Sequence, residues 1–310
     1  MVIRQTLFRL SQQPQLRSIA TTNPMAQSVA RRFVAGETLE EALSTVADIN
    51  AQGMTATLDH LGENVTGRHE AVTAADDAIR SFQAIQETGV RCNASVKLTQ
   101  LGLDIDPGFA SENLTRVVQA AAQYENFVRI DMESSEYVDR TLEIFAELFS
   151  THRNVGVVIQ ACLYRSASDL EQVVKAGARV RLVKGAYLEP PAVAFQRKED
   201  VDSNFVRLSE LLLAHGTYPA IATHDPRMVE AAQSFARSHD IPNSAFEFQM
   251  LYGIRRDLQS QLVRAGHNVR IYVPYGPHWY PYLMRRMAER PANVMFVLNN
   301  LAREVRGRRR

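Results

Sequence analysis

The stretch GVVIQACLYRSASDLEQVVKAGARVRLVKG, residues 156–185, decides the fold of this chain of 310 residues. It begins and ends with short apolar segments rich in valine, a β-branched residue that favours strands. The residues between these segments are typical of a helix that ends at Gly177, where a left-handed C-cap is expected. A strand, a helix and a second strand in such close succession form one βαβ unit with parallel strands.

This unit repeats along the chain. Eight strands are expected, at TATLDH (55–60), ASVKL (94–98), FVRIDM (127–132), GVVIQA (156–161), VRLVKG (180–185), AIATHD (220–225), FEFQML (246–251) and VRIYVP (269–274). Other helix-like stretches between them end at Gly89, Gly216 and Gly266, again as expected C-caps. Eight alternating units predict an α/β protein with a distorted (βα)8 barrel of the TIM type, and a doubly wound open sheet is the alternative.

The composition is that of an ordinary globular protein, with 45% hydrophobic and 22% charged residues. No window reaches the roughly 18 consecutive apolar residues of a membrane-spanning helix. The two cysteines, Cys92 and Cys162, form no CxxC pattern, and no HxH pair occurs. A disulfide framework and a bound metal are therefore not expected.

Both ends of the chain are basic. Residues 1–36 hold five arginines and no acidic residue, and residues 303–310 hold five arginines and one glutamate, whereas the body between them has 25 basic and 33 acidic residues. We expect a basic, helical N-terminal arm (1–36), one catalytic barrel domain (37–302) and an Arg-rich C-terminal tail (303–310). Because no aromatic platform is interleaved with the arginines, an anionic membrane surface is the expected partner rather than nucleic acid. The N-terminal segment, which lacks acidic residues, also resembles a mitochondrial transit peptide, and this remains an alternative.

Polar side chains fall where the predicted strands end, and in a parallel barrel catalysis takes place at those carboxyl ends. A strand end can be polar simply because it approaches water. Charged residues inside otherwise apolar runs on several strands indicate a shared site instead. The polar strand-end residues are Asp59, His60, Lys97, Asp131, Gln160, Arg181, Lys184, Thr223, His224, Asp225, Glu247, Gln249 and Tyr272.

Two of the four lysines, Lys97 and Lys184, lie inside predicted strands of a chain whose usual cation is arginine. A buried ammonium needs a carboxylate partner or loses its proton, and Asp131 is the expected partner of Lys97. Such a pair could position a substrate, or it could be a purely structural ion pair. A lysine with a lowered pKa could instead form a Schiff base, as in class I aldolases.

A helix is expected after the last strand, over YPYLMRRMAER (280–290), where Tyr282, Arg285 and Glu289 share one face by their spacing. An arginine-rich helix is commonly a solvated surface helix. Paired arginines such as Arg285 and Arg286 are nevertheless good carboxylate clamps, because guanidinium groups bind carboxylates through two parallel hydrogen bonds. No GxGxxG or Walker motif occurs, so neither a Rossmann nucleotide site nor a P-loop is supported.

The sequence resembles the proline dehydrogenase family, in its short, monofunctional bacterial form. The matching blocks follow one another in the family's order over about residues 37–302, and they are ASVKLTQLG (94–102), RIDMES (129–134), VIQACLYRS (158–166), RLVKGAYLEP (181–190), ATHDP (222–226), FEFQMLYGIR (246–255), VRIYVPYG (269–276) and YLMRRMAERPAN (282–293). The resemblance implies a distorted (βα)8 barrel that oxidises L-proline to Δ1-pyrroline-5-carboxylate with noncovalently bound FAD, the first step of proline catabolism. It also implies electron transfer to a membrane quinone, a partner pyrroline-5-carboxylate dehydrogenase, and a peripheral membrane location in the bacterial cytoplasm.

The resemblance implies roles for individual residues as well. Arg285 and Arg286 correspond to the pair that grips the substrate carboxylate, and Glu289 orients them. Lys97 and Asp131 correspond to positions beside the substrate. Tyr272 and Tyr282 correspond to walls around the proline ring, and Tyr187 is a further wall. The cofactor positions are Met132, Gln160, Arg181, Lys184, Gly185, Ala186, Thr223 and His224. Asp131 and Arg181 are the implied catalytic residues, with Arg181 near the reactive nitrogen of the flavin.

Two other functions fit the residues without the resemblance. One is a Schiff-base aldolase that uses Lys97 or Lys184. The other is a non-catalytic scaffold that docks through its basic tails.

Overall fold

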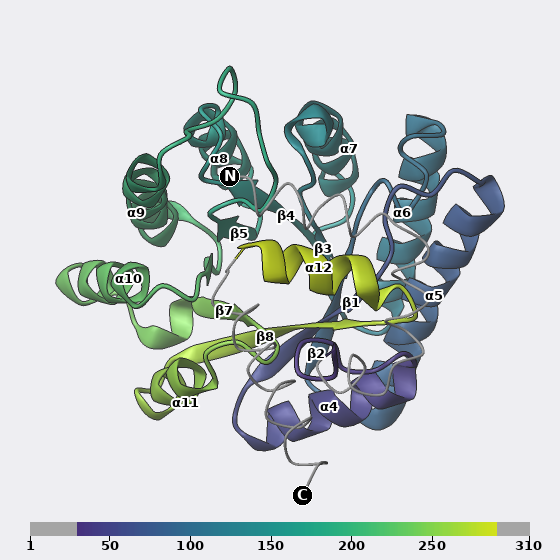
Figure 1. Ribbon diagram of the computed structural model, residues 1–310, viewed down its shortest axis with the longest axis horizontal. Helices are drawn as coiled ribbons and strands as arrows, with labels where there is room; N and C mark the ends of the chain where they lie inside the picture. Colours follow the sequence, from purple (N-terminus) through teal and green to yellow (C-terminus); the bar gives the residue numbers. More distant parts are fainter. Residues whose placement is uncertain (1–29, 290–310) are drawn as a thin grey trace, which may run out of the picture.

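Eight parallel strands close into a barrel in the order in which they occur in the chain, and β8 pairs with β1 to complete the ring. The computed structural model describes residues 30–289 (Figure 1). The strands are β1 (Thr55–His60), β2 (Cys92–Val96), β3 (Val128–Ile130), β4 (Val155–Gln160), β5 (Val180–Val183), β6 (Ala220–Ala222), β7 (Glu247–Leu251) and β8 (Asn268–Tyr275). The predicted (βα)8 barrel is confirmed, and the open sheet is excluded.

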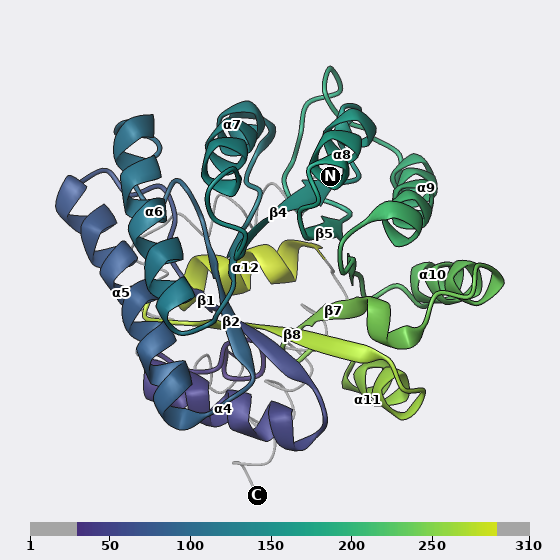
Figure 2. The same cartoon turned by 180° about the vertical axis from the view of Figure 1, so that it is seen from behind.

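All described helices but the last form an outer ring around the strands (Figures 1 and 2). In chain order the described helices are α4 (Leu39–Ala51), α5 (Arg68–Thr88), α6 (Pro107–Gln123), α7 (Val138–Phe149), α8 (Ser166–Lys175), α9 (Lys198–His215), α10 (Pro226–Ser238), α11 (Arg256–Arg264) and α12 (Trp279–Glu289), with short 3₁₀ turns η1 (Ser135–Tyr137) and η2 (Asn243–Ala245). Within residues 30–289, no helix is long and apolar enough to cross a membrane.

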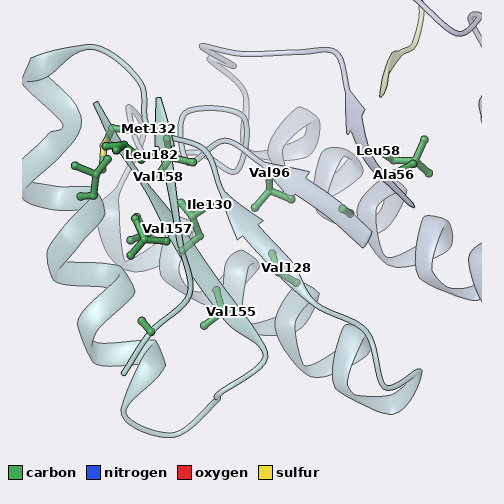
Figure 3. Packing of buried hydrophobic residues seen from close by; sticks show 14 of the residues in the cluster. Ala56, Leu58, Val96, Val128, Ile130, Met132, Val155, Val157, Val158 and Leu182 are labelled. Carbon is green, nitrogen blue, oxygen red and sulfur yellow. The ribbon is translucent and has the colours of Figure 1, made fainter. Parts of the chain in front are cut away.

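The side chains along each strand alternate between the helices and the barrel interior, as the period of two requires. Val128 and Ile130 of β3 and Val157 of β4 are fully buried among the apolar side chains that join strands to helices (Figure 3). Between them in β3, Arg129 points into the barrel and donates to the carbonyl oxygens of Val157 and Arg179. The interior is therefore polar, and the main hydrophobic core lies outside it.

The strand predictions agree with the structure most closely at β1, whose bounds are those of TATLDH. β2 begins and ends two residues earlier than predicted, and the largest difference at a single strand end is at β6, which ends at Ala222 rather than at Asp225. Asp225 is the N-cap of α10, where its side chain accepts a hydrogen bond from the backbone N–H of Arg227 at 3.1 Å. The proline at position 226 then starts the helix, which stops the strand.

Three of the four predicted glycine C-caps have a positive φ, namely Gly89, Gly177 and Gly266. The prediction was wrong for Gly216, which is extended, with φ −82° and ψ 155°. Gly216 does follow the last residue of α9, but the chain leaves that helix towards β6 without a left-handed turn.

The last described helix, α12, lies across the mouth of the barrel instead of joining the outer ring (Figure 1). It follows the carboxyl end of β8 after only three residues. Its first turns pack against residues 30–34 and Leu61 in a hydrophobic cluster separate from the main core. A helix in this position closes the side of the barrel where the strands end.

Candidate active site

A cavity of about 800 Å³ lies at the carboxyl ends of the strands, beneath α12. It is within the size range of small-molecule and cofactor sites. The sequence-predicted site residues that line it are Lys97, Asp131, Met132, Gln160, Arg181, Lys184, Gly185, Ala186, Thr223, His224, Tyr272 and Tyr282, together with Tyr187. Helix α12 confirms the predicted helix and extends over Arg285, Arg286 and Glu289, whose side chains lie outside the described part of the structure.

Asp131, which follows β3, is the centre of the charged residues in this cavity. Its Oδ1 accepts hydrogen bonds from Arg181 Nη1 at 2.6 Å and from Ser95 Oγ at 3.0 Å. Its Oδ2 accepts a hydrogen bond from the Tyr272 hydroxyl at 2.5 Å and lies 3.7 Å from Lys97 Nζ. One carboxylate thus links side chains from strands β2, β5 and β8 with Lys97, which follows the end of β2.

The protonation states of this group follow from burial and charge. Burial by itself would raise the pKa of Asp131, but the charges of Arg181 and Lys97 and the hydrogen bonds from Tyr272 and Ser95 lower it below its usual value. Burial, with the charges of Asp131 and Asp59, raises the pKa of Tyr272 well above its usual value. Asp131 is therefore ionised at neutral pH, and Tyr272 is a neutral hydroxyl that donates to it.

Lys97 has a closer partner than the one the sequence suggested. Its Nζ lies 2.7 Å from Asp59 Oδ1, at the end of β1, and 3.7 Å from Asp131. Burial favours the neutral amine, but these two carboxylates outweigh it and raise the pKa of Lys97 above its usual value. Lys97 is a buried ammonium that faces the cavity.

Arg181 is held on all sides by side chains of the barrel interior. Its Nε donates to Gln249 Oε1 at 2.6 Å, and its Nη2 lies 3.2 Å from Ser95 Oγ. The guanidinium carbon is also 5.2 Å from the centre of the Tyr272 ring, within the range of a cation–π contact. A guanidinium fixed in this way is a permanent positive charge at a defined place in the cavity wall.

A second group of charges lies at the edge of the cavity, around Lys184. Lys184 Nζ is 2.5 Å from Asp202 Oδ1 and 3.1 Å from Asp225 Oδ2. Lys198 and Arg227 contact the same two carboxylates. Three cations and two anions leave one net positive charge here, which suits a ligand that carries phosphate.

The backbone near Lys184 is also open to a ligand. Gly185 has a φ of +109°, and a Cβ at this position would overlap with the sulfur of Cys162, so the site requires glycine. On the neighbouring strand ends, the backbone N–H of Leu251 donates to His224 Nε2 at 2.8 Å. That ring nitrogen is therefore unprotonated, and a neutral His224 carries its proton on Nδ1.

Glu133 and Gln160 complete the described wall at β3 and β4. Glu133 accepts hydrogen bonds from the backbone N–H and hydroxyl of Thr99 at 3.1 and 2.5 Å, and Gln160 donates to the backbone carbonyl of Glu133 at 2.9 Å. Burial raises the pKa of Glu133 despite these hydrogen bonds. The three residues tie the ends of β2, β3 and β4 together below the cavity.

Sequence reasoning noted Asp59 and Gln249 as polar strand ends but gave them no role, and it did not consider Ser95. All three hold the residues that it did select. The alternation of strand side chains was the available signal, because Ser95 is two residues from Lys97 on the same face of its strand. Which strand-end side chains meet across the barrel depends on the register between strands, and the sequence does not show that register.

Comparison with known proteins agrees with this geometry. The family profile described as proline dehydrogenase matches residues 42–299. The chain is similar to proline dehydrogenase 1 of Bacillus subtilis, with 43% identity over 89% of this chain and 91% of that protein. It is similar to the proline dehydrogenase of Deinococcus radiodurans, with 40% identity over 96% of this chain and 97% of that protein. Among solved structures, it superposes on proline utilization A from Bdellovibrio bacteriovorus inactivated by N-propargylglycine with a TM-score of 0.79 and 28% identity, covering 84% of this chain and 32% of that one.

Proposed function

This chain belongs to the proline dehydrogenase family and is an oxidoreductase that acts on a CH–NH group, and we propose that it converts L-proline to Δ1-pyrroline-5-carboxylate with FAD in the cavity described above. The observation that carries this assignment is the meeting of Lys97, Asp131, Arg181 and Tyr272 at one end of the barrel. These residues stand at the positions that the family resemblance selects. The family and the class of reaction are established, so what we propose is the identity of the product, of the cofactor and of the electron acceptor.

The residues of the cavity fit FAD in three respects. The excess positive charge around Lys184 can hold phosphate oxygens. Gly185, which lines the cavity beside that charge, has an exposed backbone. The fixed guanidinium of Arg181 can stabilise negative charge on the ring system of a reduced flavin. When bound, FAD would accept the electron pair that leaves proline.

The chain's own residues have separate tasks in this reaction. The ammonium of Lys97 faces the cavity and can attract the substrate carboxylate. The family resemblance implies the same role for Arg285 and Arg286. Tyr272 and Tyr282, both lining residues, limit where the ring can lie. A fixed carboxylate and a confined ring bring the carbon next to nitrogen to one position, which is the main requirement for removing its hydrogen.

Oxidation removes a hydrogen with its electron pair from the ring carbon and a proton from the adjacent nitrogen. Asp131 is a weak base because its pKa is lowered, and it already accepts hydrogen bonds from Arg181, Tyr272 and Ser95. Asp131 therefore positions its neighbours and balances their charge. The substrate nitrogen must lose its proton before the C–H bond breaks, because its lone pair is needed to form the imine.

The aldolase alternative is not favoured by the lysines. Schiff-base formation needs a neutral amine, and the carboxylates of Asp59 and Asp131 raise the pKa of Lys97. Lys184 Nζ is engaged in ion pairs with Asp202 and Asp225. A scaffold without catalysis would have no need for this charged cavity inside the barrel.

We further propose that the electrons pass to a membrane quinone and that the basic ends, residues 1–36 and 303–310, bring the enzyme to an anionic membrane surface in the bacterial cytoplasm. Excess arginine in both segments supports this proposal. A pyrroline-5-carboxylate dehydrogenase that consumes the product is the expected metabolic partner. Most of the two terminal segments lies outside the described residues.

The cofactor can be tested on the purified protein. We expect a yellow protein that releases FAD into the supernatant after denaturation by acid or heat, with about one FAD for each chain. Flavin that stays on the precipitated polypeptide would show covalent attachment. A colourless protein that reduces no acceptor with proline even after added FAD would refute the cofactor assignment.

A further inference from the structure

Helix α12 is attached through a hydrophobic cluster that is separate from the main core and includes Leu61 and Tyr282 of the cavity wall. Its residues Trp279, Tyr280 and Leu283 are buried in the second hydrophobic cluster, with Phe33 and Val34 from the other end of the described chain. The main core contributes none of the residues of this cluster. The position of α12 therefore depends on residues 30–37 more than on the barrel core.

The backbone of residues 32–36 is fixed against the barrel. The N–H of Ala35 donates to the carbonyl of Pro274 at 2.8 Å, and the N–H of Gly276 donates to the carbonyl of Gly36 at 3.0 Å. These two hydrogen bonds flank the point where β8 ends and the chain turns towards α12. Nearby, a Cβ on Gly253 would overlap with the carbonyl oxygen of Arg32, so the two backbones pass in close contact.

One side-chain hydrogen bond joins this segment to the helix itself. Trp279 Nε1 donates to Glu37 Oε1 at 3.0 Å, and Trp279 is only 3% exposed. Glu37 is held in turn by α4, because its backbone N–H donates to Glu41 Oε2 at 2.8 Å. Glu41 also forms the capping box of α4 with Thr38. The acceptor of the Trp279 hydrogen bond thus stands on a rigid helix start.

We propose that Glu37 and Trp279 are positioning residues for proline binding: their hydrogen bond fixes the first turn of α12 and so places the substrate wall that the helix carries. Tyr282, which lines the cavity, is three residues after Trp279 on the same helix. Arg285 and Arg286 follow within the next turn. A small rotation of the first turn of α12 moves all of these relative to Lys97, while the groups assigned to the cofactor at and after the ends of β5 and β6 keep their places.

The chain supplies its own probe for this anchor, because Trp279 is the only tryptophan in the sequence. We expect Glu37→Ala in the holoenzyme to shift the tryptophan emission to longer wavelength, since the buried indole loses the carboxylate that its N–H donates to. The KM for proline should rise by about tenfold, the change expected from losing a hydrogen bond to a charged group. The kcat with a soluble dye acceptor and the flavin content should stay within about twofold of the unmodified enzyme.

Two further variants separate positioning from general damage. Glu37→Gln keeps an oxygen that can accept from the indole, so it should restore most of the emission and the KM. Glu40→Ala removes the same charge from the first turn of the same helix, α4, without touching Trp279, and it should leave both readouts unchanged.

Three results would overturn the inference. One is an equal KM in the Glu37→Ala and Glu40→Ala variants, and another is an unchanged emission in Glu37→Ala. The third is a parallel fall in kcat and flavin content that Glu37→Gln does not relieve. The inference rests on the cavity being the proline site, and that assignment fails separately if Asp131→Asn leaves kcat/KM unchanged.

Discussion

Replacing Asp131 with asparagine removes one charge at the centre of the cavity and almost no volume. The carboxylate accepts hydrogen bonds from Arg181, Tyr272 and Ser95 and lies within 3.7 Å of Lys97. An asparagine side chain has a single acceptor oxygen, so its NH₂ group must face a donor that the carboxylate satisfied. Arg181 would also lose its nearest carboxylate, and Lys97 would keep Asp59 but lose the second of its two carboxylates.

The size of the effect follows from the hydrogen bonds that the substitution breaks. Breaking one partner of a buried ion pair costs about 3–5 kcal/mol of folding stability. For catalysis, removing the charged acceptor of both Arg181 and Tyr272 costs about 1.5–3 kcal/mol for each hydrogen bond. If these two side chains must be in place for the reaction, kcat/KM for proline should fall by roughly 100-fold or more.

A matched control lies one layer deeper in the barrel. Glu247 is also a buried carboxylate in an ion pair, with Arg270 at 2.9 Å, but it does not line the cavity. Glu247→Gln should lose a similar amount of stability in denaturant unfolding and keep most of its kcat/KM at a temperature where both variants are folded. Equal kinetics in Asp131→Asn and the unmodified enzyme, or equal losses in the two variants, would refute the assigned role.

The pH dependence of stability gives an independent check on Asp131. Its pKa in the folded protein is below the usual value of 3.8, so its contribution to stability is complete above that pH. The contribution is lost as the pH falls through the lower, folded-state pKa. The difference in unfolding free energy between the unmodified protein and Asp131→Asn should therefore be constant near neutral pH and shrink below about pH 3.8.

Three other results are expected. If Tyr272 confines the proline ring as proposed, 4-hydroxyproline should be a much poorer substrate than proline, and Tyr272→Ser should narrow the difference in kcat/KM between the two. Equal kcat/KM for the two substrates in the unmodified enzyme would dismiss this role. Arg285→Met and Arg286→Lys should each lower kcat/KM for proline by about 30-fold or more and leave the flavin content normal. This is the effect of losing a desolvated contact with the substrate carboxylate, roughly 2–5 kcal/mol. Near-native kinetics would mean that both arginines lie on a solvated surface helix. Removing residues 303–310 should weaken binding to anionic vesicles without changing dye-linked activity, and that binding should weaken with salt; salt-independent binding would exclude an electrostatic attraction.

The barrel could be predicted because its signal is local and repeated. Each strand is a short apolar run, and each following helix has its own periodicity and often its own C-cap, as at Gly177. The errors occurred at the ends of elements, where capping and the direction in which the chain leaves decide the outcome. Asp225 shortens β6 by capping α10, and Gly216 ends α9 with an extended rather than a left-handed residue.

The site was predicted residue by residue from the family resemblance, and the described members do line one cavity. The sequence could not tell which carboxylate is closest to Lys97, because both Asp59 and Asp131 lie on strands that neighbour β2. The anchor of α12 was missed for a different reason. Glu37 and Trp279 are 242 residues apart, and neither belongs to a strand, so no spacing or periodicity connects them.

The most direct test of the account is to add L-proline to the purified protein without any electron acceptor or oxygen and to record its visible spectrum. We predict that the flavin absorbance bleaches with proline, that Asp131→Asn bleaches far more slowly, and that one pyrroline-5-carboxylate forms for each flavin reduced. A flavin that proline leaves oxidised, or an Asp131→Asn variant that bleaches at the unmodified rate, would contradict the claim that this cavity is where proline is oxidised.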